Sequence, residues 1–489
     1  MREGESLYAT FALVYMQEFE MLKSTITHVE SVEEALGVEK KFSYQVELKG
    51  HITRDMVEEI SRLKGEPDWM RRLRLRMLEL FEKLPTPKWV RAVEEIDLEA
   101  LVHYAKPQTE TVSSWDQVPK EIREYYEKLG LPEIEAKALL GLGAQFDSEI
   151  IYFNLKKKLQ EKGVIMLPME EAVRRYPDLV QKYFMRVFPP EHKFAALHGA
   201  LWSGGVFIYV PPGVRIEQPL ETFFFIGQSM ESQMEHSIVV ADKGAYVHWI
   251  EGCSAPRLLK YSFHDGMVEG YAHEGATLKI TTVQNWSRNV INFNNKRAIA
   301  EAGAKVHWVE GSIGSKTTYT FPSTVLKGEG ASTEIVGITA AKGPYWKENG
   351  AKVWHLAPRT SSRVVNKSIS AEGGVVVYRG VVHVQKGAKH ARSHVQCDSL
   401  VLDKDSATLT VPHDQVFEET AVVTHEATAS SISEEKLAYL RARGFTEDDA
   451  KAAIVLGFVG DILKDLPFEY AVVLGRVIEL EFGKLSKVG

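Results

Sequence analysis

A glycine-centred step recurs through the middle of this sequence and limits the folds that the chain can adopt. The step is Gly-Ala or Gly-Gly, and it begins at residues 244, 275, 303, 330, 350, 373 and 387. Most of these steps precede a short run of β-branched and aromatic residues, such as Tyr246-Val-His-Trp-Ile250 and Lys305-Val-His-Trp-Val309. Glycine permits the positive φ that a turn needs, so each step predicts a turn followed by a strand.

The spacing of these steps, at tens of residues, indicates a stacked array of similar units. No long helical pattern interrupts the stretch from Ala195 to Thr424, which argues against the helical crossovers of a doubly wound sheet. We therefore predict that this stretch folds as a β-solenoid (β-helix). A β-sandwich is the alternative, although its strands usually follow at shorter and more even intervals.

Helical periodicity characterises the chain before the β-stretch. Apolar residues share one face over 53–84, and Pro85 and Pro87 end that pattern. A second helical block covers 119–162, and its last part, 147–162, also reads as a helix. We therefore expect a helical N-terminal region.

Helical patterns return after the β-stretch. Ser433 caps one predicted helix, Thr446 with Asp449 resembles a capping box for the next, and Pro467 opens a last one. The sequence thus divides into three units, which are a helical N-terminal region (1–190), a β-helix core (191–430) and a helical C-terminal region (431–489).

Composition and charge exclude several classes of function. A net charge of −7 over 489 residues argues against a nucleic-acid partner, and no apolar run approaches the ~20 residues of a membrane span. The apolar run at 9–16 is short and lacks a basic flank, so we expect no signal peptide. Two cysteines in so long a chain indicate a reducing compartment, and we predict a cytoplasmic protein. One disulfide between Cys253 and Cys397 stays open as the alternative.

The two cysteines are the first candidates for chemistry. Cys253 lies between Gly252 and Pro256, which predicts a strand end or bend, and nearby Arg257 would favour its thiolate. Strand alternation puts Cys397 on the same face as Val395 and Val401, which predicts that this face is interior. For both residues, simple packing as a small buried side chain is the alternative.

A second group of candidates is polar. His425 and Glu426 are adjacent, so they can serve one site only at a strand end or bulge, and a solvated surface pair is the alternative. Gln284 and Trp286 share a strand face, and Lys296 needs a partner if it lies inside the solenoid. The sequence contains neither a P-loop nor a Cys-x-x-Cys or His-Glu-x-x-His pattern, so we expect neither nucleotide hydrolysis nor one of these zinc sites.

Long motifs resemble the SufB/SufD family of iron–sulfur cluster assembly proteins, and within it the SufB scaffolds. They extend from about Gly65 to the C-terminus and include Ala144-Gln-Phe-Asp-Ser-Glu149, Trp202-Ser-Gly-Gly205, Glu251-Gly-Cys-Ser-Ala-Pro256, Gln284-Asn-Trp286, His355-Leu-Ala-Pro358, Cys397-Asp-Ser399 and His425-Glu-Ala-Thr428. SufD chains typically lack both cysteine contexts and the glutamate after the histidine, which favours SufB.

The resemblance implies a right-handed parallel β-helix and a scaffold that is not itself an enzyme. It implies that Cys253 accepts persulfide sulfur and that Cys397, His425 and Glu426 hold a transient iron–sulfur cluster. It further implies a sulfur route through the β-helix along Gln284, Trp286 and Lys296.

The implied partners are a SufC-like ATPase bound by the C-terminal helices, a SufD-like paralogue or a second copy of this chain, and a cysteine desulfurase system.

This chain departs from the family pattern at three places. Phe225-Ile-Gly227 replaces a more polar Arg-Ile-Asn segment, and Thr424 stands where many relatives have a glutamate. The segment Thr410-Val-Pro-His-Asp-Gln415 also differs from the common pattern. Two other functions compete with the scaffold. A SufD-like structural subunit would lack a cofactor, and a carbohydrate-active β-helix enzyme would need a cluster of outer carboxylates that the sequence does not suggest.

Overall fold

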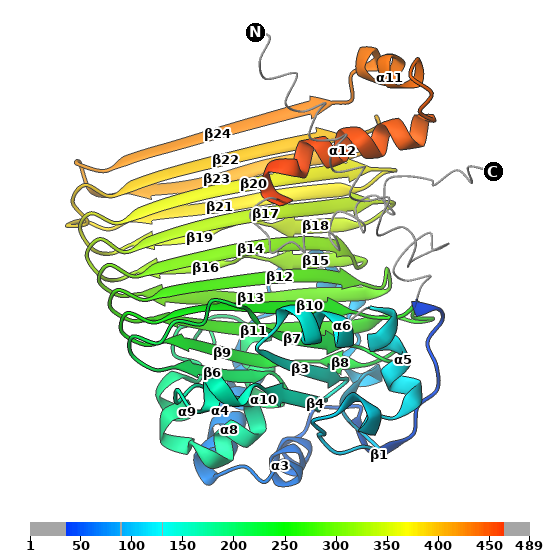
Figure 1. Ribbon diagram of the computed structural model, residues 1–489, viewed down its shortest axis with the longest axis vertical. Helices are drawn as coiled ribbons and strands as arrows, with labels where there is room; N and C mark the ends of the chain where they lie inside the picture. Colours follow the sequence, from blue (N-terminus) through cyan, green and yellow to red (C-terminus); the bar gives the residue numbers. More distant parts are fainter. Residues whose placement is uncertain (1–35, 89, 130, 464–489) are drawn as a thin grey trace.

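The computed structural model describes residues 36–88, 90–129 and 131–463, and at its centre parallel strands stack into a β-solenoid of about eight turns (Figure 1). Each complete turn contributes to a ten-stranded sheet and to a facing twelve-stranded sheet. Helical regions lie at both ends of the chain. This arrangement confirms the predicted solenoid core with helical flanks.

Parallel pairing dominates both sheets, and only β3–β4 and β5–β6 pair antiparallel within them. The ten-stranded sheet contains, in spatial order, β24 (Val422–Ser431), β22 (Arg392–Val401), β20 (Ser361–Ala371), β17 (Ser332–Lys342), β14 (Lys305–Gly314), β12 (Thr277–Trp286), β10 (Tyr246–Ser254), β7 (Leu220–Phe225), β3 (Gly141–Phe146) and β4 (Glu149–Leu155). The twelve-stranded sheet contains β15 (Thr317–Thr320), β18 (Trp346–Asn349), β21 (Val375–Val384), β19 (Lys352–His355), β16 (Ser323–Leu326), β13 (Val290–Ala300), β11 (Ser262–Ala272), β9 (His236–Ala241), β6 (Val206–Val210) and β5 (Ile165–Pro168), with β23 (Ala407–Val416) beside β21 and β8 (Ser232–Gln233) beside β11.

The glycine steps mark the corners of the solenoid. Six of the seven place a glycine at φ between 64° and 94°, namely residues 244, 275, 303, 330, 373 and 387. Gly350 is the exception, because there an added side chain would collide with the carbonyl oxygen of Arg379. Between corners, alternate side chains point inward and build an apolar interior that includes Trp249, Leu278 and Trp308.

The N-terminal region packs around the first turns of the solenoid (Figure 1). A separate antiparallel pair, β1 (Tyr44–Lys49) and β2 (Val102–Pro107), belongs to it. Its helices are α3 (Arg54–Leu63), α4 (Asp68–Lys83), α5 (Lys120–Lys128), α6 (Leu131–Ala138), α7 (Lys157–Gln160), α8 (Met169–Arg175), α9 (Pro177–Tyr183) and α10 (Lys193–Leu201), with short 3₁₀ turns at η1 (Arg91–Glu95), η2 (Leu98–Ala100) and η3 (Trp115–Gln117).

Two helix predictions in this region need correction. The pattern over 53–84 is two helices, because Gly65 at φ 60° and Pro67 separate α3 from α4. The predicted helix over 147–162 is wrong. There the β-branched and aromatic run inside β4 pairs with β3 and extends the ten-stranded sheet, and only the short α7 is helical.

The C-terminal region begins with α11 (Glu434–Arg441) and α12 (Glu447–Leu463). The Ser433 side chain caps α11, and the Thr446 hydroxyl accepts from the Asp449 amide and donates to its carboxylate, as predicted. Apolar residues of α12, including Val455 and Val459, pack on the outer face of the ten-stranded sheet. The helix predicted from Pro467 lies outside the described residues. None of the helices within the described ranges has the length and apolarity needed to cross a membrane.

Candidate functional site

Cys253 lies near the end of β10 with its side chain in the solenoid interior, where only 2% of it is exposed. The Gln284 amide nitrogen donates to its sulfur at 3.1 Å, and the thiol faces a Glu251 carboxylate oxygen at 3.7 Å. Alternation along β10 puts Glu251 and Cys253 on the same inward face. The thiol is therefore enclosed by polar groups inside an otherwise apolar core.

Trp286 determines which end of the Gln284 amide faces the sulfur. An indole N–H can only donate, and it lies 2.7 Å from the Gln284 Oε1 atom. That contact leaves the amide N–H groups to face Cys253 and the Glu251 carboxylate, the latter at 2.8 Å. The structure thus brings two predicted route residues, Gln284 and Trp286, together with Cys253.

Lys296 is the third predicted route residue, and it is fully buried beside the same cluster. Its ammonium lies 3.5 Å from Glu251 and 3.2 Å from Glu310, and it donates to the Thr282 hydroxyl at 2.8 Å. The predicted need for a partner is confirmed, because two carboxylates compensate this one buried cation.

Burial raises the pKa of Cys253 well above its usual value, and the nearby Glu251 charge raises it further. Arg257 is exposed on the loop beyond β10 and is not among the main causes of this shift. The expectation that Arg257 favours a thiolate is therefore wrong, because the raised pKa favours the neutral thiol.

Cys397 lies five strands further along the ten-stranded sheet, on β22. It is 1% exposed, and burial raises its pKa to about 12. The imidazole of His425 on β24 lies 3.7 Å from its sulfur, and the Tyr378 side chain lies beside it from the facing sheet. Both cysteines are free thiols, so the alternative of a Cys253–Cys397 disulfide is excluded.

Glu426 does not join Cys397 and His425. The pairing of β24 with β22 is regular through Glu426 and continues to Ser431, so adjacent residues keep opposite faces and the Glu426 side chain is exposed. The carboxylate closest to His425 is instead Asp414 on β23, at 3.6 Å from the imidazole Nδ1. Within the described ranges, no set of three or more His, Cys, Asp or Glu side chains is placed to hold a metal ion.

Two inward-facing columns, which we name the polar columns, connect the two cysteines across successive strands of the ten-stranded sheet. Strand register defines them, with Glu251, Thr282, Glu310, Gly337, Asn366 and Cys397 in one column and Cys253, Gln284, Ser312, Thr339, Ser368 and Ser399 in the other. With neighbouring strands about 4.8 Å apart, the five steps between the cysteines amount to roughly 24 Å. The two sulfurs are therefore too far apart for direct transfer.

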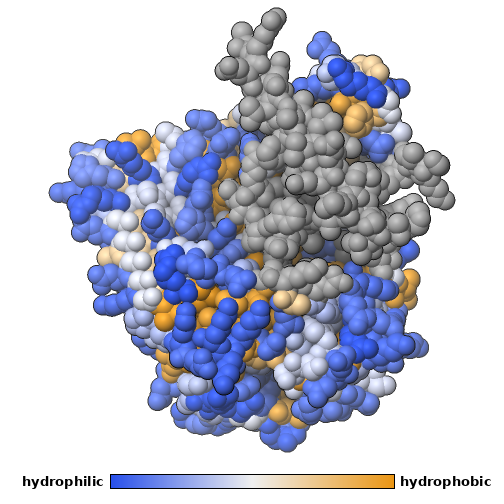
Figure 2. Space-filling model, viewed as in Figure 1, coloured by the Kyte–Doolittle hydropathy of each residue, from blue (hydrophilic) through white to orange (hydrophobic). Residues whose placement is uncertain are grey.

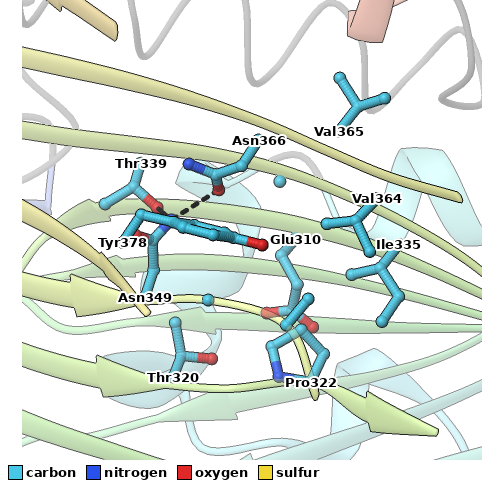
Figure 3. Close-up of a pocket in the computed structure, with 13 residues that line it drawn as sticks. Glu310, Thr320, Pro322, Ile335, Thr339, Asn349, Val364, Val365, Asn366 and Tyr378 are labelled. Atoms are coloured by element: carbon cyan, nitrogen blue, oxygen red, sulfur yellow. Dashed lines mark hydrogen bonds between the residues drawn. The ribbon is translucent and has the colours of Figure 1, made fainter. Parts of the chain in front are cut away.

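A narrow cavity lies between the two cysteine sites (Figure 3). Its lining includes Glu310, which belongs to the Lys296 cluster, and Tyr378, which lies beside Cys397. Polar side chains on the wall include Asn349, which donates to the Asn366 side-chain oxygen at 2.7 Å. Glu310, Gly337, Thr339 and Asn366 of the polar columns line this space, which is about the size of one water molecule.

The last turn of the solenoid is open within the described residues. Strand β24 ends the ten-stranded sheet, and β23 has only β21 beside it. Large apolar side chains stay exposed on and next to these two strands, namely Leu409, Val411, Val416, Phe417 and Val422. Cys397 and His425 lie directly beneath this open end.

Comparison with known proteins agrees with this geometry. Residues 224–458 match the model of the SufBD core domain of the SUF iron–sulfur cluster assembly system, and residues 63–222 match the SufBD N-terminal region. This chain belongs to the SufBD family. A relative from Staphylococcus epidermidis called an iron–sulfur cluster assembly SufBD family protein is 44% identical over 431 residues, which is 88% of this chain and 93% of the relative. Family members of that description from Staphylococcus aureus and Staphylococcus haemolyticus are also 44% identical over the same shares.

Sequence reasoning missed the carboxylates of this SufBD interior. Glu251 and Glu310 occupy equivalent positions in two related segments, Val247-His-Trp-Ile-Glu-Gly-Cys253 and Val306-His-Trp-Val-Glu-Gly-Ser312. That internal repeat was the available signal, because equivalent positions of a solenoid stack above one another. Asp414 lies in the segment 410–415, which differs from the family pattern, but that difference alone did not predict its contact with His425.

Proposed function

We propose that this SufBD chain is a SufB-type scaffold on which an iron–sulfur cluster is assembled. Cys253 accepts persulfide sulfur, the polar columns carry it past Gln284 and Lys296, and the cluster forms beside Cys397 at the open end. The observation that carries this proposal is the register that joins the two cysteines through two columns of mainly polar residues inside an apolar solenoid. A cofactor-free, SufD-like subunit would have no use for such columns, whose buried charges are costly.

The cluster is cargo on this scaffold, and the chain provides an incomplete set of ligands. Cys397 and His425 offer a thiolate and an imidazole, both of which suit iron. Clusters commonly take four protein ligands, so partner groups must complete the site. Glu426 is exposed on the outer side of β24, where a partner chain that extends the sheet would bring its own side chains beside it.

The open turn supports a partner that continues the solenoid. Edge strands with unpaired backbone groups and exposed apolar side chains bind further strands. We infer that the occupant is a SufD-like paralogue or a second copy of this chain, joined through β23 and β24. Free thiols on both cysteines also support a reducing location, which we take to be the cytoplasm.

Replacing Cys253 by serine should block sulfur uptake and leave partner binding intact. The experiment combines the full chain, its partner subunits, a cysteine desulfurase system and iron under anaerobic conditions. Mass spectrometry detects the sulfur bound to Cys253, and visible absorption measures the assembled cluster. Normal sulfur uptake by the serine variant, or a wild-type complex that stays colourless, would contradict the proposed scaffold.

The two described C-terminal helices provide a candidate surface for the SufC-like ATPase. Their apolar groove is lined by Glu435, Lys436, Tyr439, Leu440 and Ile454. Figure 2 shows apolar surface on this part of the molecule with hydrophilic residues around it. Apolar residues of α12 pack on the outer face of the ten-stranded sheet, which supports a role for this helix other than capping the open turn.

Tyr439→Ala should weaken ATPase binding about tenfold or more, since exposed aromatic residues dominate such interfaces. Tyr439 is 57% exposed, so the melting temperature should not change. Leu259→Ala is the control, because Leu259 is 68% exposed and lies far along the chain from the groove. Unchanged pull-down of the ATPase by the Tyr439 variant would remove this groove as its docking surface. Reversing Glu447 is a poorer test, because Glu447 pairs with Lys451 at 2.8 Å.

A further inference from the structure

Glu251 is the carboxylate beside the sulfur-accepting thiol, and the proposed scaffold assigns it no proton-transfer step. Its Oε1 atom lies 3.7 Å from the Cys253 sulfur, and both side chains are at most 2% exposed. We propose that Glu251 is the general base that takes the thiol proton when Cys253 accepts sulfur, an inference that rests on the proposed function.

The charge balance of the cluster favours this role. Lys296 is one cation between two carboxylates, those of Glu251 and Glu310, so the ionised triad has a net charge of −1 and room for one more proton. Moving the thiol proton to Glu251 turns a neutral thiol into a thiolate and a carboxylate into a neutral acid. The net charge of the buried site is unchanged, so the transfer avoids the large cost of creating a new charge in the interior.

Gln284 holds the two reacting groups in place. One amide nitrogen donates both to the Glu251 oxygen, at 2.8 Å, and to the Cys253 sulfur, at 3.1 Å. The same donor therefore contacts the carboxylate before the proton moves and the thiolate after it moves. Trp286 fixes this orientation through its bond to Gln284 Oε1, so no amide rotation is needed during the step.

The sulfur transfer balances without any oxidant or reductant. The Cys253 thiol gives its proton to Glu251, and the thiolate attacks the terminal sulfur of the donor persulfide. A new S–S bond forms at Cys253, and the S–S bond of the donor breaks. The donor thiolate leaves with the electron pair and takes the proton from the Glu251 carboxyl group, which restores the carboxylate.

The surrounding groups keep Glu251 a competent proton acceptor. Burial raises the pKa of Glu251, while Lys296 opposes that rise; the other charged or titratable groups near it are Glu310, Glu235 and His264. A base whose pKa is raised toward neutrality accepts a proton more readily than an ordinary glutamate. Cys253 itself has a raised pKa, so without a base it would rarely be a thiolate.

The test compares Glu251→Gln with Glu348→Gln in the full chain, and the sulfur donor is inorganic polysulfide. The glutamine at 251 keeps the shape and still accepts the Gln284 hydrogen bond, whereas Glu348 is a buried glutamate on β18 that pairs with Arg379 and lies outside the Cys253 cluster. We expect Glu251→Gln to slow sulfur uptake at Cys253 about 100-fold, as for loss of a general base, and Glu348→Gln to stay close to wild type. The rate of the Glu251 variant should also rise more steeply with pH.

The direction of the rate change distinguishes a general base from a carboxylate that only raises the pKa of the Cys253 thiol. If Glu251 only raised the thiol pKa, its replacement would ease thiolate formation and uptake would become faster; a faster or unchanged rate overturns the role as base. Wild-type protein that takes up no sulfur at Cys253 overturns the proposed function instead, and this inference with it. Glu251→Asp retains a carboxylate and should keep part of the rate of sulfur uptake. It is the test variant if the glutamine variant does not fold.

Discussion

Replacing Cys397 by alanine should abolish stable cluster assembly and barely change the fold. The thiol is the soft ligand of the proposed cluster site, and alanine leaves the His425 imidazole without it. The loss of one buried sulfur should lower the free energy of unfolding by only about 1 kcal/mol. Cluster assembly is measured by visible absorption of the anaerobically reconstituted complex, and stability is measured by urea denaturation.

Ser393→Ala is the matched control for this variant. Ser393 lies four residues before Cys397 on β22, shares its strand face, is 4% exposed and lies outside the polar columns. The Ser393 variant should assemble a normal cluster, because it removes a hydroxyl that neither the proposed route nor the proposed ligand set uses. A normal cluster in the Cys397 variant would show that the site lies elsewhere.

Lys296→Met should produce the largest loss of stability among the interior variants. The substitution keeps much of the side-chain volume but leaves Glu251 and Glu310 without their buried cation. Removing one partner from a buried charge cluster costs about 3–5 kcal/mol. Urea denaturation at pH 8 measures this deficit, and Lys305→Met on the exposed start of β14 is a control that should change little.

The deficit should shrink as the pH falls. Burial already raises the pKa values of Glu251 and Glu310 above 4.5, and loss of Lys296 raises them further. Groups with a raised folded-state pKa stabilise the fold below the unfolded value and lose that contribution as the pH rises through the folded value. The variant should therefore recover much of its stability relative to wild type near pH 5. A deficit that is equal at both pH values would mean that the two carboxylates are not the cause.

The fold was largely predictable because short local sequence patterns mark the corners of the solenoid. A glycine at positive φ followed by β-branched residues marks a solenoid corner without any knowledge of distant contacts, and six of the seven predicted steps behave in this way. The helix prediction for 149–155 was wrong because local sequence does not decide the structure of this segment. Its apolar residues fit a helical face as well as a strand, and only pairing with β3, which is a tertiary contact, decides between the two.

The candidate site was only partly predictable, because register decides which side chains meet. Resemblance supplied Cys253, Gln284, Trp286 and Lys296, and the structure places all four in one cluster. Glu426 shows the limit, since its neighbour His425 faces Cys397 and strand alternation turns Glu426 away. Asp414 reaches His425 from the facing sheet, a contact that depends on how many residues each turn contains.

The open turn at β23 and β24 also bears on how a cell must produce this chain. Within the described residues, β23 and β24 each have an unpaired edge flanked by apolar side chains, and such edges seed aggregation. On the proposed assembly, a protomer made in excess of its partner would expose these edges, so balanced synthesis of the subunits would matter for solubility as well as for activity. The proposed assembly thus links subunit pairing to quality control, because the edge that would bind the partner would make an orphan subunit prone to precipitate and a target for proteolysis.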